Sequence, residues 1–125
     1  MCQVDTASRL VEIEAIAGVE GVDVVQMEPL DLSAGMGYLW DPRNRKVRDA
    51  TKEAERKVLE MRKKLGASDG GGTAERGAYL GGFAMPHDRP ENLKMRGYHM
   101  VAGAVDVGIF RQAAVEERES GHRGR

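Results

Sequence analysis

Apolar and polar positions follow two kinds of pattern along this chain, and together they predict four strand–helix units. Short apolar runs predict strands at residues 1–5, 22–27, 79–85 and 98–104. Helical spacing predicts helices over 6–17, 42–65 and 106–119, and a short helix that starts at Asp88 and Pro90 and ends at Gly97. Residues 28–37 read as a loop with one helical turn. This alternation predicts an α/β fold with parallel strands, either in an open sheet or in part of a barrel.

The helix predicted over 42–65 has one apolar face and a basic outer surface. Residues 41–64 contain ten Lys or Arg and five Asp or Glu. A basic helix can serve nucleic acid or calmodulin-like partners, but the favoured interpretation is a solvated surface with ion pairs between residues four apart. The helix over 106–119 is expected to turn Ile109, Phe110, Ala113 and Ala114 inward.

Composition supports one domain over residues 1–119. The chain has 125 residues, of which 41% are hydrophobic, whereas a complete (β/α)8 barrel takes about 250. Residues 66–78 are rich in glycine and are expected to form a flexible connector, and residues 120–125 are expected to be a disordered tail.

Charge and cysteine content exclude several classes of function. A net charge of -1 gives the chain as a whole no electrostatic reason to bind nucleic acid or a membrane surface, and no apolar run is long enough to span one. The single cysteine, Cys2, excludes an internal disulfide and fits a reducing compartment. We therefore expect an intracellular protein, in the cytoplasm or an organelle.

Candidate chemical groups follow the predicted strands, where ligands of parallel α/β folds bind. Asp5 and Asp31, which follow neighbouring strands, can together hold a divalent cation such as Mg²⁺, although spacing alone favours helix capping. His87 and Asp88 can form an acid–base pair, but an ordinary loop histidine is the favoured interpretation. Two further acidic groups in similar positions are Glu28 and Asp106.

Several sequence motifs are similar to those of a known enzyme family. CQVDT (2–6), GVDVVQM (21–27), PLDLSAGMG (29–37) and VAGAVDVG (101–108) resemble the HpcH/HpaI aldolase family, which is related to citrate lyase β-subunits. YLWDP (38–42) and FAMPHD (83–88) look closest to the plant members of that family.

The resemblance implies a class II, pyruvate-dependent aldolase with a (β/α)8 barrel, which cleaves 4-hydroxy-2-oxo acids to pyruvate and an aldehyde. It implies a Mg²⁺ or Mn²⁺ ion held by Asp31 and by Asp5, which stands where the family has a glutamate. The peptide N–H groups around Leu30 and Asp31 would hold the carboxylate of pyruvate or another 2-oxo acid. Glu28 stands beside that carboxylate, where the family has a glycine.

The same resemblance implies that this chain corresponds to the second half of the barrel, incomplete as a lone chain and without the family's catalytic Arg and His. We therefore expect weak or no aldolase activity from the chain alone. The alternative is a non-catalytic half barrel that pairs with itself or with another chain, since a half barrel has two open strand edges.

Overall fold

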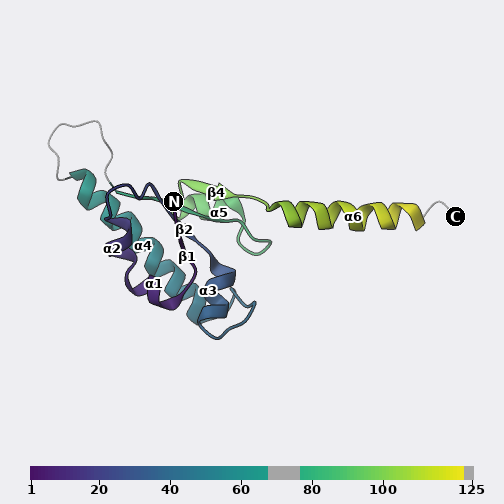
Figure 1. Ribbon diagram of the computed structural model, residues 1–125, viewed down its shortest axis with the longest axis horizontal. Helices are drawn as coiled ribbons and strands as arrows, with labels where there is room; N and C mark the ends of the chain where they lie inside the picture. Colours follow the sequence, from purple (N-terminus) through teal and green to yellow (C-terminus); the bar gives the residue numbers. More distant parts are fainter. Residues whose placement is uncertain (68–76, 123–125) are drawn as a thin grey trace.

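The computed structural model describes residues 1–67 and 77–122 and shows a four-stranded parallel sheet with helical crossovers (Figure 1). The strands are β1 (Cys2–Val4), β2 (Val24–Met27), β3 (Tyr79–Phe83) and β4 (Met100–Ala102). They lie in the sheet in chain order, and each pairs in parallel with the next. The prediction of an α/β fold with four parallel strands is confirmed.

The first crossover contains two short helices instead of the single helix predicted over 6–17. They are α1 (Ala7–Val11) and α2 (Ile13–Ala17). Thr6 caps α1, because its side-chain oxygen accepts a hydrogen bond from the N–H of Arg9 at 3.4 Å. The break at Glu12 leaves Val11 exposed and buries Ile13 completely.

The second crossover contains α3 (Pro29–Gly35) and the long helix α4 (Arg45–Ala67). The predicted loop over 28–37 thus forms a longer helix than the one turn expected, and Pro29 stands at its first position, where a missing N–H costs nothing. The prediction that Gly66 ends this helix is wrong, because α4 continues to Ala67. A glycine within a helix lowers its stability by only about 1 kcal/mol relative to alanine, which packing of the rest of the helix can offset. Residues 68–76 of the predicted connector lie outside the described residues.

The hydrophobic core lies between one face of the sheet and the helices α2, α4 and α5 (Pro90–Met95). Side chains alternate between the two faces along each strand, so that Val25 and Met27 of β2 both lie in this core. The register places Gln3, Gln26 and Gly81 side by side. These alternate with the core residues and therefore point to the opposite face of the sheet.

The last helix, α6 (Asp106–His122), extends away from the rest of the fold (Figure 1). The prediction that its apolar residues point inward is wrong, because Ile109 is 59% exposed and Phe110 is 76% exposed. Apolar periodicity marks a face that gains by being covered, but it does not say which element covers it. The helix also continues into the predicted tail, where no proline interrupts it. Residues 123–125 lie outside the described residues.

Candidate functional site

Two cavities lie next to each other at the carboxyl edge of the sheet, and Pro29, Phe83 and Met85 line both. We call the larger one, about 570 Å³, the acidic cavity. Glu28 and Asp31 line it, together with residues from β1, from the loop before α4 and from α6. Local sequence sets this arrangement. Glu28 follows β2 directly, and Pro29 starts α3 so that Asp31 falls in its first turn.

Glu28 is an acidic group of this cavity whose pKa is shifted by its surroundings. Burial raises its pKa above the usual range, and the negative charges of Asp31 and Asp5 raise it further. Hydrogen bonds from Gln3 and Gln26 act in the opposite direction, and the Nε2 of Gln3 donates to the Oε1 of Glu28 at 3.2 Å. Asp31 and Asp5 are therefore close enough for their charges to act on Glu28.

The structure brings together three of the four predicted site residues. Glu28, Leu30 and Asp31 line the acidic cavity, whereas Asp5 does not. The Oδ1 of Asp5 accepts a 2.6 Å salt bridge from Arg9. Within residues 1–67 and 77–122, no three His, Cys, Asp or Glu side chains gather in a group that could hold a metal ion. The assignment of Asp5 and Asp31 as metal ligands stays a prediction.

The donor set nevertheless fits a hard divalent cation. Carboxylate oxygens are the ligands that Mg²⁺ prefers, and this ion commonly takes only one or two of them from the protein. Burial and then the charges of Asp31 and Asp5 raise the pKa of Glu28, and a cation beside Glu28 and Asp31 would offset the repulsion between these charges. The salt bridge to Arg9 engages the Oδ1 of Asp5.

Several residues at this site were missed from the sequence. Gln3 and Gln26 both lower the pKa of Glu28 through side-chain hydrogen bonds. The Oε1 of Gln26 is buried without a hydrogen-bond partner among the described residues. Polar residues at alternate positions of two predicted strands were the available signal. Trp40 lines the acidic cavity with a φ of 58°, which is uncommon for a residue other than glycine. Nothing in the sequence around Trp40 predicts that it lines the cavity.

The pair His87 and Asp88 is arranged for structure instead of acid–base chemistry. Arg96 donates to both carboxylate oxygens of Asp88, at 2.9 and 2.7 Å, and this holds the pKa of Asp88 below its usual range. His87 is exposed. The favoured interpretation of His87 as an ordinary loop residue therefore agrees with the structure. Asp106 begins α6, and its Oδ1 accepts a hydrogen bond from the N–H of Val107 at 2.7 Å.

The fold is that of an α/β protein with a parallel sheet, and the acidic cavity lies at the carboxyl ends of its strands, where ligands of such folds bind. Comparison with known proteins makes the class specific, since the model of the family described as HpcH/HpaI aldolase/citrate lyase matches residues 1–113. The chain belongs to the HpcH/HpaI aldolase/citrate lyase family.

Curated relatives support the family assignment, and they are longer than this chain. A hydroxypyruvate/pyruvate aldolase of Pseudomonas aeruginosa is 34% identical over 109 residues, which make up 86% of this chain and 41% of that enzyme. A 4-hydroxy-2-oxo-heptane-1,7-dioate aldolase of Escherichia coli is 36% identical over 66 residues, 53% of this chain and 25% of that enzyme. The chain thus spans less than half of these relatives. Both are bacterial, and the expected closeness to plant members has no support.

Solved structures confirm the fold. An HpcH/HpaI aldolase/citrate lyase family protein from Burkholderia cenocepacia superimposes with a TM-score of 0.73 at 24% identity, over 96% of this chain and 41% of that one. An HpcH/HpaI aldolase from Desulfitobacterium hafniense gives a TM-score of 0.73 at 20% identity, over 94% and 40%. In the described part of this chain, no helix is both long enough and apolar enough to cross a membrane.

Proposed function

We propose that this chain forms the metal-binding and 2-oxo-acid-binding part of a pyruvate-type aldolase, and corresponds to the second half of its barrel. The observation that carries the proposal is the acidic cavity of this aldolase-family chain, where Glu28 precedes α3 and Asp31 lies in its first turn. Names of the relatives, such as hydroxypyruvate/pyruvate aldolase, indicate the class of substrate.

The first turn of α3 is suited to bind a carboxylate. Glu28 precedes the helix but makes no side-chain capping bond, so it does not occupy the N–H groups of Leu30 and Asp31. N–H groups at the start of a helix attract anions. In our proposal they orient the carboxylate of the 2-oxo acid towards the acidic groups. The side chain of Glu28 opposes the approach of this anion unless it is protonated or neutralised by a cation.

Glu28 and Asp31 are the residues that would hold the cation, with Asp5 as a third candidate. When bound, a Mg²⁺ or Mn²⁺ ion supplies Lewis-acid polarisation of the carbonyl group of the 2-oxo acid. The residues of the chain position that group, and Phe83, Val105 and Ile109 supply apolar contacts along the wall of the cavity.

Thermal unfolding tests the metal site independently of turnover. We expect Mg²⁺ or Mn²⁺ to raise the melting temperature of the chain, because an ion that binds only the folded state stabilises it. Asp31→Asn should abolish the rise. Asp49→Asn, which removes an exposed carboxylate paired with Arg45 on α4, should leave it unchanged. A melting temperature that no divalent ion changes would remove the metal site from the proposal.

Pyruvate release tests the reaction. A 4-hydroxy-2-oxo acid is supplied with Mn²⁺, and pyruvate is measured by its reduction with lactate dehydrogenase. We expect slow or undetectable release by the chain alone, since the resemblance assigns the catalytic Arg and His of the family to a part that this chain does not contain. Release at the rate of an ordinary aldolase would show that the chain needs no further half.

A non-catalytic role in association is the second candidate, and two observations favour it. In the sheet order β1-β2-β3-β4, the strands β1 and β4 each pair with one neighbour only among the described residues. The helix α6 exposes Phe110 and Val107 at 76% and 72%. Exposed apolar faces of this kind are typical of association surfaces. This role predicts a dimer or larger assembly, which a measurement of the molecular mass in solution would distinguish from a monomer.

A further inference from the structure

The smaller cavity at the carboxyl edge, about 390 Å³, carries the opposite charge from the acidic one. We call it the basic cavity. It lies between the N-terminal half of α4 and the segment from Met85 to Tyr98. Arg43, Arg48 and Lys52 line it and are all exposed, so they stand at its rim. Arg48 and Lys52 are four residues apart and thus share one face of α4.

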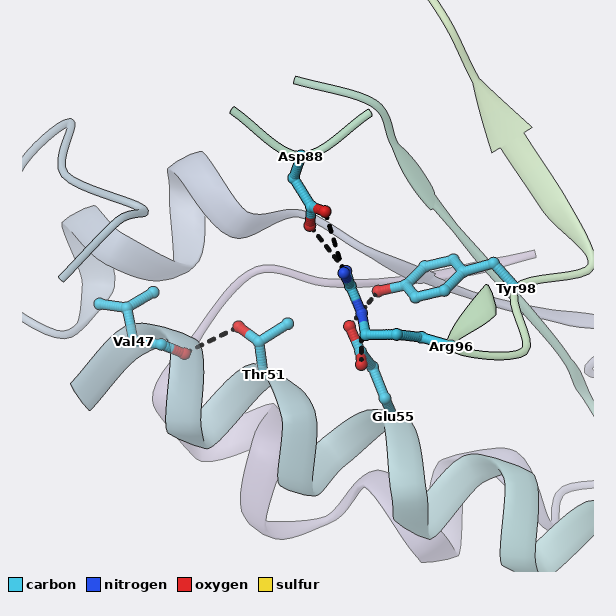
Figure 2. Close-up of polar contacts among 6 residues, drawn as sticks. All are labelled: Val47, Thr51, Glu55, Asp88, Arg96 and Tyr98. Atoms are coloured by element: carbon cyan, nitrogen blue, oxygen red, sulfur yellow. Dashed lines mark hydrogen bonds and ion pairs between the residues drawn. The ribbon is translucent and has the colours of Figure 1, made fainter. Parts of the chain in front are cut away.

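The two carboxylates that line this cavity are already paired within the wall. Figure 2 shows the arrangement: Arg96 donates to both oxygens of Asp88, and its Nε donates to the Oε2 of Glu55 at 3.1 Å. The hydroxyl of Tyr98 donates to the Oε1 of Glu55 at 2.7 Å. One guanidinium and one hydroxyl therefore supply hydrogen bonds to both carboxylates, and the single positive charge of Arg96 offsets one of their two negative charges, which leaves the three cations at the rim in excess.

The rim cations have no counter-charge of their own. Neither Arg43, Arg48 nor Lys52 makes a side-chain hydrogen bond or an ion pair with any residue that the structure describes. Elsewhere on α4, Arg56 pairs with both Glu53 and Glu60. The expectation that the basic residues of this helix form ion pairs with residues four apart thus holds for Arg56 but not for the three residues at this cavity.

The deeper wall of the basic cavity is apolar. Leu93 and Tyr98 are buried, and Phe83 and Met85 are half-buried. A volume of about 390 Å³ is many times the roughly 30 Å³ that one water molecule takes up in the liquid. It lies in the range of small-molecule sites. The cavity therefore offers space for an organic group below a cationic rim.

We propose that the basic cavity binds a small organic molecule that carries a phosphate group. The phosphate would lie between Arg43, Arg48 and Lys52, and the organic part would contact Phe83, Met85 and Leu93. A phosphate matches the rim better than a carboxylate does, because it carries up to two negative charges and offers three oxygens. Two arginines can each bind such oxygens in a bidentate manner.

This site does not rest on the aldolase function. It shares only wall residues with the acidic cavity, and neither Glu28 nor Asp31 lines it. A phosphate would be repelled by those two carboxylates, whereas the basic rim attracts it. The two cavities thus select different ligands at one edge of the sheet.

Calorimetric titration of the whole chain tests the proposal, with phenyl phosphate as the probe and with salt held constant. We expect binding that the double variant Arg48→Gln/Lys52→Gln weakens by about ten-fold or more, since it removes two charged hydrogen-bond donors. The control is Lys63→Gln/Lys64→Gln, which removes the same charge from an exposed part of the same helix outside both cavities. It should change the affinity by about two-fold at most.

Benzoate and inorganic phosphate separate the contributions of the two parts of the probe. We expect both to bind more weakly than phenyl phosphate, since one lacks the second charge and the other lacks the apolar group. Equal losses in the two double variants would show general attraction to a basic helix and overturn the site. So would benzoate that binds as tightly as phenyl phosphate, or an absence of binding by phenyl phosphate. Circular dichroism confirms that each variant is folded.

Discussion

The hydroxyl of Tyr98 donates a 2.7 Å hydrogen bond to the Oε1 of Glu55 and so ties the segment before β4 to the middle of α4. The two residues are 43 positions apart, and both are buried, with exposed fractions of 6% and 4%. A buried carboxylate needs donors on both oxygens, and Arg96 supplies the other one. This pair therefore holds α4 against the segment that leads into β4.

Loss of the Tyr98 hydroxyl should measurably weaken the fold. Tyr98→Phe leaves the Oε1 of Glu55 buried with one donor fewer, and we expect the free energy of unfolding to fall by about 1–2 kcal/mol in a urea titration. The control is Tyr38→Phe on a half-buried ring outside the core. It should change stability by about 0.5 kcal/mol at most. Equal effects of the two changes would contradict the importance of this bond.

The raised pKa of Tyr98 leads us to expect a loss of stability at alkaline pH. Burial raises the pKa of Tyr98 well above its usual value, and the charge of Glu55 adds to this effect. The unfolded chain therefore gives up the phenol proton first. The stabilisation is complete below a pH of about 10 and is lost progressively above it. We expect Tyr98→Phe to lose less stability than the parent protein between neutral and strongly alkaline pH, as measured by urea titrations across that range.

Glu28 should destabilise the fold at neutral pH in the absence of a cation. Its raised pKa means that the folded state disfavours the ionised carboxylate, so the penalty is absent below the usual pKa of a glutamate, about 4.3, and grows as the pH rises. We expect Glu28→Gln to raise the melting temperature at pH 7, with a gain that shrinks on acidification. Glu20→Gln, on an exposed turn, serves as the control. A gain independent of pH would point to packing instead of charge.

Gly82 of β3 is required by a close contact. A side-chain Cβ at this position would overlap the ring of Tyr98. We expect Gly82→Ala to destabilise the protein by about 1–3 kcal/mol through overpacking. Gly66 of α4 has open space around it, so Gly66→Ala should instead stabilise by about 0.5–1 kcal/mol. Thermal unfolding should therefore show a lower melting temperature for Gly82→Ala and a higher one for Gly66→Ala.

The apolar surface of α6 predicts self-association. Sedimentation velocity over a range of concentrations should show larger species, and Phe110→Asp should reduce them because it places a charge on the exposed apolar face. Val11→Asp changes an equally exposed apolar residue on α1 and should leave association unchanged. A monomer at all concentrations would exclude pairing of the chain with itself and leave only pairing with another chain.

Local patterns predicted the strands and the long helix because their signals lie in neighbouring residues. Val24 to Met27 and the apolar stripe that includes Val47 and Val58 are examples. The division of the helix at Glu12 and the exposure of Phe110 were not predictable in this way, since they depend on what packs against each element. At the site, position after a strand was enough to find Glu28 and Asp31. The pairing of Asp5 with Arg9 and of Asp88 with Arg96 required the three-dimensional arrangement.

The sheet order β1-β2-β3-β4 has a consequence for how this chain acquires its structure. Each strand pairs with the one made just before it, so every crossover closes a loop between consecutive units and none must wait for a distant segment. Each crossover still closes a long loop before its strands can pair, which makes parallel pairing slower than local helix formation, but the partner of each new strand is already present. Each strand–helix unit can therefore dock on the preceding one in the order in which the ribosome releases them.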